Sequence, residues 1–120
     1  MKTDEEIILL LNEDRTDLLL KIGIDLNADF QAKQTEEELI NSAEYWYLSR
    51  KKELAIILCK DNIIIKSIKL PMTSERQVQL VKTISCIISK HEIWVSSWFV
   101  SVLLVKEGLE SLCGEYHTGL

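Results

Sequence analysis

The sequence predicts an α+β fold in which a small mixed sheet is packed by helices. Three observations lead to this prediction. Apolar residues recur with helical spacing in the first 52 residues, two runs rich in β-branched residues flank Asp61-Asn62, and a third such run begins near residue 92. We expect the order α-α-β-β-α-β-α within one domain spanning residues 1–120, because this length is typical of a single domain.

Two capping boxes indicate where the first two helices begin. Thr3 is followed three residues later by Glu6, and Thr35 by Glu38, so each hydroxyl and carboxylate can satisfy the other residue's backbone N–H. The basic run 50–52 is expected to end the second helix, where cations suit the negative end of the helix dipole.

The first helical segment is expected to break at residues 12–16 and to restart near Asp17. Its apolar face would carry Ile8, Leu11, Leu18 and Ile22. Gly23 would end it, because glycine adopts the left-handed conformation without strain. We expect residues 25–34 to form a loop.

The central third predicts a hairpin. Residues 54–59 and 63–70 are apolar and β-branched, and Asp61-Asn62 between them tolerates the positive φ angles of a tight turn. Pro71 would end the second strand. Ser74 with Gln77 then predicts a helix over residues 74–90, along which apolar residues are spaced three or four apart.

The last third gives conflicting signals. Residues 93–105 are rich in Val, Ile and Trp, which favours a strand, yet the apolar spacing from Trp98 onward favours a helix. We expect a short strand at 92–95, a cap at Ser96 or Ser97, and a helix that runs to Cys113 with Gly114 as its C′ residue. Residues 115–120 would be a loose tail.

The cysteines and the N-terminus predict a cytoplasmic protein. Cys59, Cys86 and Cys113 lie among apolar neighbours with no C-x-x-C spacing, so we expect buried, reduced thiols. The N-terminus is acidic where a signal peptide needs positive charge. The uncharged run 93–105 is shorter than the roughly 20 apolar residues of a membrane span, so no membrane association is expected.

No motif in the chain predicts catalysis, a cofactor or a metal. Asp25, Asn27, Asp29 and Glu36 have the spacing of a calcium-binding loop, but Phe30 occupies the position where that loop needs glycine. We therefore interpret residues 25–36 as a loop and a helix cap. His91 and His117 have no metal-ligand spacing, and there is no nucleophile elbow, P-loop or dinucleotide fingerprint.

Nucleic-acid binding is not expected either. The aromatic run 45–47 directly precedes the basic run 50–52, but on a helix these side chains point around the whole circumference. A sequence pI near 5.0 also argues against a surface that neutralises phosphates.

The strongest functional signal is the uneven distribution of charge. The formal net charge of the chain is −5, but residues 1–48 contain 12 acids and four bases, whereas residues 49–120 carry a net charge of +3. Helix capping explains the acids at 4–6 and 36–38. It does not explain the remaining six, which are our candidate partner-binding residues: Glu13, Asp14, Asp17, Asp25, Asp29 and Glu44.

We interpret the chain as a non-catalytic protein-binding module, most simply a small acidic inhibitor like an immunity protein or antitoxin, which binds a basic protein partner. Carboxylates on the first two helices would speed the encounter and impose selectivity. The alternative is a homodimer or larger scaffold, in which another copy covers the apolar helix after residue 97. A small enzyme with an unrecognised site is a third possibility.

Overall fold

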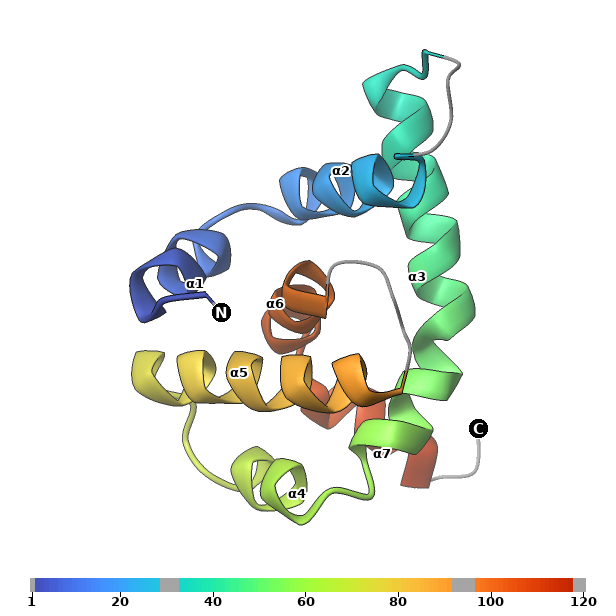
Figure 1. Cartoon of the computed structure of the whole chain (residues 1–120). Helices are drawn as coiled ribbons and strands as arrows, with labels where there is room; N and C mark the ends of the chain where they lie inside the picture. Colours follow the sequence, from blue (N-terminus) through green and yellow to red (C-terminus); the bar gives the residue numbers. More distant parts are fainter. Residues whose placement is uncertain (1, 29–32, 92–96, 118–120) are drawn as a thin grey trace.

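The expected α+β fold is wrong, because the described part of the chain consists of helices and contains no strand. The structure is a computed structural model that describes residues 2–28, 33–91 and 97–117. Its helices, drawn in Figure 1, are α1 (Asp4–Leu11), α2 (Arg15–Leu26), α3 (Glu36–Leu58), α4 (Asn62–Ile68), α5 (Ser74–Lys90), α6 (Ser97–Glu107) and α7 (Leu109–His117).

Helix α6 forms the centre of the core. It contacts α1, α2, α5 and α7, and in Figure 1 it lies inside the ring that the other helices make. Its residues from Val100 to Val105 are all buried. A helix surrounded on every side is apolar around its whole circumference. This explains why residues 93–105 gave a strand-like signal, and why α6 leaves no apolar stripe for a second copy to cover.

The predicted hairpin is the second correction. Residues 54–58 continue α3 instead of forming a strand, and Leu54, Ala55 and Leu58 are buried while Ile56 is exposed. That pattern has helical rather than alternating periodicity. Helix α3 therefore runs six residues past the basic run 50–52 that was expected to end it.

Asp61 marks the start of a helix and not the turn of a hairpin. One of its carboxylate oxygens accepts hydrogen bonds from the backbone N–H groups of Ile63 (2.9 Å) and Ile64 (3.2 Å), as an N-cap does. The second expected strand is accordingly α4, whose Ile64 side chain is fully buried. Packing overrides the β propensity of the isoleucine run.

The signals at the starts of helices are mostly confirmed. Both capping boxes form, at Thr3 with Glu6 and at Thr35 with Glu38. The chain breaks between α1 and α2 as expected, with Asp14 as the N-cap of α2. Helix 74–90 has the expected bounds, although its N-cap is Thr73 and not Ser74.

On α1, Ile7 and Leu10 face the core, whereas Ile8, which was expected to do so, is largely exposed. The expected loop over residues 25–34 is also partly helical, because α2 continues to Leu26.

Gly23 and Gly114 do not lie at the helix ends where the sequence predicts them. Gly23 lies buried inside α2, and Gly114 lies inside α7. Gly108 instead separates α6 from α7, with a φ of 100° that disfavours other residues. The expected tail is helical as far as His117, while residues 118–120 and the expected strand at 92–95 lie outside the described residues.

A small-residue seam joins α5 to α6. The hydroxyl oxygens of Ser85 and Ser97 are 2.9 Å apart, and Ser89 donates to the Ser97 hydroxyl at 3.3 Å. Ser101, fully buried, donates to the backbone carbonyl of Ser97 at 2.5 Å. Small hydroxyl side chains allow the two helices to approach closely while satisfying their own polar groups.

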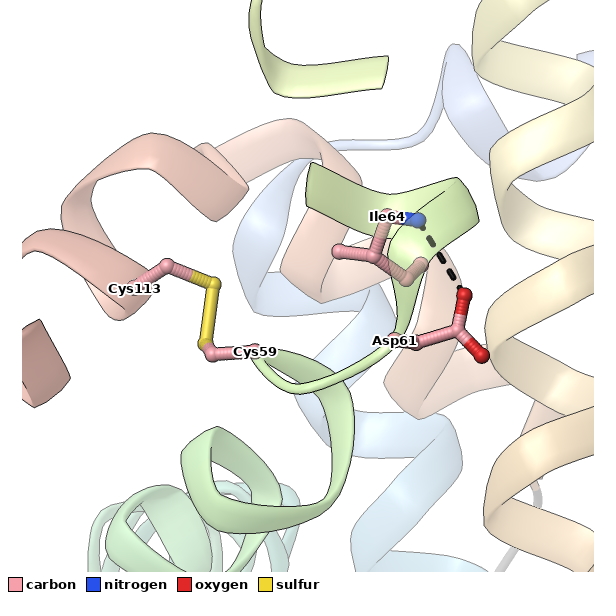
Figure 2. The surroundings of a disulfide bond; sticks show 4 residues. All are labelled: Cys59, Asp61, Ile64 and Cys113. Carbon is pink, nitrogen blue, oxygen red and sulfur yellow. Dashed lines mark hydrogen bonds between the residues drawn. A yellow bond between two sulfur atoms is a disulfide. The ribbon is translucent and has the colours of Figure 1, made fainter. Parts of the chain in front are cut away.

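The expectation of three buried, reduced thiols is also corrected. Cys59 and Cys113 form a disulfide that links the end of α3 to α7 (Figure 2), with the two sulfur atoms buried in the core. Cys86 is a free thiol but is exposed on α5. The cysteines are separated by 54 residues, so only the tertiary fold brings them together.

Candidate protein-binding site

The structure divides five of the six predicted acidic residues into two groups and does not describe the sixth. Glu13 and Glu44 pair with cations of the same chain, and Asp14 caps a helix. Asp17 and Asp25 lie exposed on α2. Asp29 lies outside the described residues. The predicted set is therefore not one continuous acidic face.

Glu44 belongs to a polar network that joins α2, α3 and α6. The Arg15 guanidinium donates to both carboxylate oxygens of Glu44, at 2.9 and 2.7 Å. It also donates through Nε to Glu107 at 2.7 Å. Tyr47, buried beneath them, donates its hydroxyl to the other oxygen of Glu107 at 2.5 Å. Lys51 lies 3.7 Å from that same oxygen.

The network controls the ionisation of its members. Burial by itself raises the pKa of Glu107, but hydrogen bonds from Tyr47 and Arg15 and the charges of Lys51 and Arg15 outweigh it, so the net pKa is lowered. Burial, together with the hydrogen bond to Glu107, raises the pKa of the Tyr47 hydroxyl far above its usual range. Glu107 is therefore anionic and Tyr47 neutral near pH 7.

The cavity beside this network is too small for a substrate. Its volume is about 30 Å³, and its walls include Tyr47, Lys51, Glu107 and Gly108. This volume takes about one water molecule. We therefore assign Arg15, Glu44, Tyr47 and Glu107 to holding three helices together.

Glu13 and Asp14 stabilise the corner between α1 and α2. The Lys21 ammonium is 3.0 Å from a carboxylate oxygen of Glu13. The Asp14 side chain accepts from the Asp17 backbone N–H at 2.9 Å. Lys106 of α6 donates to the Leu11 carbonyl at 2.8 Å and to the Glu13 carbonyl. These contacts account for both acids without a partner protein.

Asp17 and Asp25 are the acids that remain available on α2. They are eight residues apart, which is about 12 Å along a helix axis. Ile24 lies between them on the outward side and is 51% exposed. Because neither carboxylate is paired with a cation of the described residues, both can accept one from outside.

A groove begins beside Ile24. It has a volume of about 210 Å³ and lies between the end of α2 and the start of α3, where Ala28 and Leu39 contribute apolar surface. Gln34 also lines it, and the amide oxygen of this side chain is buried with no hydrogen-bond partner in the described structure. The groove thus combines apolar walls with an unsatisfied acceptor, and its lining residue Ile24 directly precedes Asp25 in the chain.

The environment of Asp25 disfavours its own charge. Surrounding protein partly desolvates the carboxylate, which raises its pKa. It also lies in the last turn of α2, where the helix dipole is negative and no basic residue compensates it. A cation supplied by a partner would relieve both effects.

The structure gives no support to calcium binding in this region. Asn27 uses its side-chain amide to donate to the Gly23 carbonyl at 2.8 Å, and Glu36 lies in the first turn of α3. Phe30 lies outside the described residues. Among the described residues, no group of three or more His, Cys, Asp or Glu side chains is placed to hold a metal ion. None of the described helices is both long and apolar enough to cross a membrane.

Comparison with protein-family models, with curated proteins and with solved structures finds no match for this chain. Its function is therefore inferred from its own residues.

Sequence reasoning missed the apolar half of this site. The sequence predicts that the helix ends at Gly23, so Ile24 receives no role, and Leu39 is placed only on a helix face. The missing signal was that the helix continues past Gly23, which places Ile24 and Asp25 on one exposed turn.

Proposed function

We propose that the chain is a non-catalytic protein-binding module whose α2 surface receives a basic protein partner. We name this surface the α2 site and define it by Asp17, Ile24 and Asp25 together with the groove lined by Ala28 and Leu39. The observation that carries the proposal is Asp25, an exposed and only partly desolvated carboxylate in the last turn of α2, with no cation of the described residues paired to it.

The arrangement supports a partner of particular chemistry. Asp17 and Asp25 are eight residues apart, about 12 Å along the helix axis, which suits two Lys or Arg side chains about two helical turns apart. The exposed Ile24 and the groove between α2 and α3 match an apolar side chain placed beside the cation that meets Asp25. Such a surface combines an apolar anchor with charges that steer the encounter. The immunity-protein or antitoxin interpretation is one form of this proposal.

The proposal predicts that the charge of Asp25 lowers the stability of the fold and strengthens the binding of a cationic partner. Asp25→Asn removes an unfavourable charge from the end of α2, so we expect it to raise the free energy of unfolding by about 0.5 kcal/mol. The same change should weaken binding of a cationic partner. A residue placed only for stability would not behave in this way.

A synthetic amphipathic helix of Lys and Leu can serve as the probe. We expect its addition at low salt to shift backbone NMR resonances in α2 and near Leu39, and 0.5 M salt to reverse the shifts. Asp17→Lys with Asp25→Lys should abolish them. Glu110→Lys, an exposed acid on α7, is the matched control and should leave them unchanged. Shifts spread over the whole surface, or lost equally in the control, would contradict the α2 site.

The Cys59–Cys113 bond counts against the cytoplasmic location expected from the sequence, because structural disulfides persist mainly in oxidising compartments. The thiol measurement described in the Discussion tests this point.

A further inference from the structure

The outward face of α3 carries a row of side chains that the fold leaves uncovered. Tyr45 is 78% exposed, Leu48 53% and Ile56 41%. Asn41 and Lys52 are also exposed and continue the row at helical spacing. The opposite face packs into the core through Ala43, Tyr47, Leu54 and Leu58. In Figure 1, α3 runs along one edge of the molecule.

This row, which we call the α3 ridge, has the spacing of a helix–helix seam. Asn41, Tyr45, Leu48, Lys52 and Ile56 follow one another at intervals of four, three, four and four residues. That spacing keeps side chains on the side of a helix that faces a second helix. The exposed tyrosine near its centre is a residue type that forms contacts at low entropic cost, and the exposed leucine adds apolar surface beside it.

The charges along the α3 ridge are opposite at its two ends. Glu37 lies in the first turn of α3, while Lys52 and Lys60 lie at or just beyond its last turns. None of these three forms an ion pair within the described residues. A uniformly basic partner would meet repulsion at the lysine end, and a uniformly acidic one at the glutamate end.

A second copy of the same chain, placed antiparallel, satisfies both ends at once. In a register where paired residue numbers sum to 97, Tyr45 of one helix faces Lys52 of the other copy, and Glu37 lies at the end of the partner helix, just past which Lys60 follows. Leu48 faces Ser49, and Asn41 faces Ile56. The helix dipoles also oppose each other favourably, and a lysine over a tyrosine ring gains a cation–π contact. A parallel arrangement would place like charges together.

We propose that the α3 ridge is the interface of an antiparallel, two-fold homodimer. A two-fold interface uses the same patch on both copies, as this one does. One helix pair is small for a protein interface, so we expect a reversible dimer with a Kd on the order of 100 µM. The dimer leaves Asp17, Ile24 and Asp25 outside the interface, and the proposal is independent of the α2 site.

Sedimentation equilibrium over a range of concentrations tests the dimer directly. The wild-type chain should show mass increasing with concentration toward twice 13.8 kDa. Leu48→Glu should weaken association at least tenfold. Ile63→Glu is the matched control, because Ile63 is an exposed aliphatic residue like Leu48 but lies on α4. It should leave association unchanged, and circular dichroism should show both variants folded.

A charge swap tests the register. Glu37→Lys alone places two cations at each end of the interface, and Lys60→Glu alone places two acids there, so each should be largely monomeric. An equimolar mixture restores an opposite-charge pair at both ends and should dimerise like the wild type. A wild-type chain that stays monomeric at 1 mM would overturn the proposal. So would equal effects of Leu48→Glu and Ile63→Glu, or a mixture that fails to recover.

Discussion

Gly23 in α2 lies directly against the backbone of Leu39 in α3. A Cβ atom at Gly23 would stand 2.2 Å from the Leu39 carbonyl oxygen and 2.8 Å from its carbonyl carbon. Backbone atoms cannot rotate away as a flexible side chain can. The close crossing of α2 and α3, and with it the groove of the α2 site, therefore depends on the absence of a side chain here.

Gly23→Ala should destabilise the protein. An added methyl in a helix interior usually gains about 1 kcal/mol from helix propensity, but here the steric overlap should produce a net loss of about 2 kcal/mol. Urea unfolding followed by circular dichroism measures the change. Gly114→Ala is the control, because Gly114 is also helical and has open space where a Cβ would be. It should be neutral or stabilising, and similar losses in both variants would refute the packing argument.

Stability should depend on pH through Glu107. Because Tyr47, Arg15 and Lys51 together hold its pKa below the usual value of 4.5 despite burial, its ionised form stabilises the folded state. That contribution is fully present above the unfolded-state pKa and is lost as pH falls through the lower folded-state pKa. The Glu107→Gln variant has no ionisable carboxyl group at this position, so its stability does not include this pH-dependent contribution.

We therefore expect the wild type to lose more stability than Glu107→Gln when the pH is lowered from about 6 to about 3. Urea midpoints at a series of pH values give the comparison. Every other acid is common to the two proteins, so the difference between their curves isolates Glu107. Parallel curves would show that the network does not stabilise the ionised form.

Breaking the disulfide should cost more than any single side chain. In the chain-entropy view, a bond closing a loop of 54 residues contributes about 4 kcal/mol by restricting the unfolded chain. Cys59→Ser with Cys113→Ser should lower the urea midpoint accordingly, while Cys86→Ser, which replaces the exposed free thiol, should change it little.

Counting thiols tests whether the bond exists in the protein as isolated. Protein purified in the presence of a thiol-alkylating label should carry one label when it is denatured without reductant. It should carry three labels when it is then reduced and alkylated again with the same reagent. Three labelled cysteines before reduction would show that the bond is absent in the expressing cell and would remove the objection to a cytoplasmic location.

Part of the candidate site could be predicted from the sequence and part could not. The charge asymmetry directs attention to α2, where Asp17 and Asp25 are exposed. It could not separate them from Glu44, because the cation that occupies Glu44 is 29 residues away and is shared with Glu107, 92 residues from Arg15. Ion pairs between distant residues are decided by the packing of helices and not by local charge.

The sequence by itself determined where α1 and α3 begin. Thr3 and Thr35 mark these starts through side chains that bond to backbone groups three residues away, so the signal is entirely local. The conformation of residues 54–70 was decided only by the tertiary structure. Their β-branched and apolar side chains fit a buried helix as well as a buried strand, and what chose the helix was the surface available to pack against.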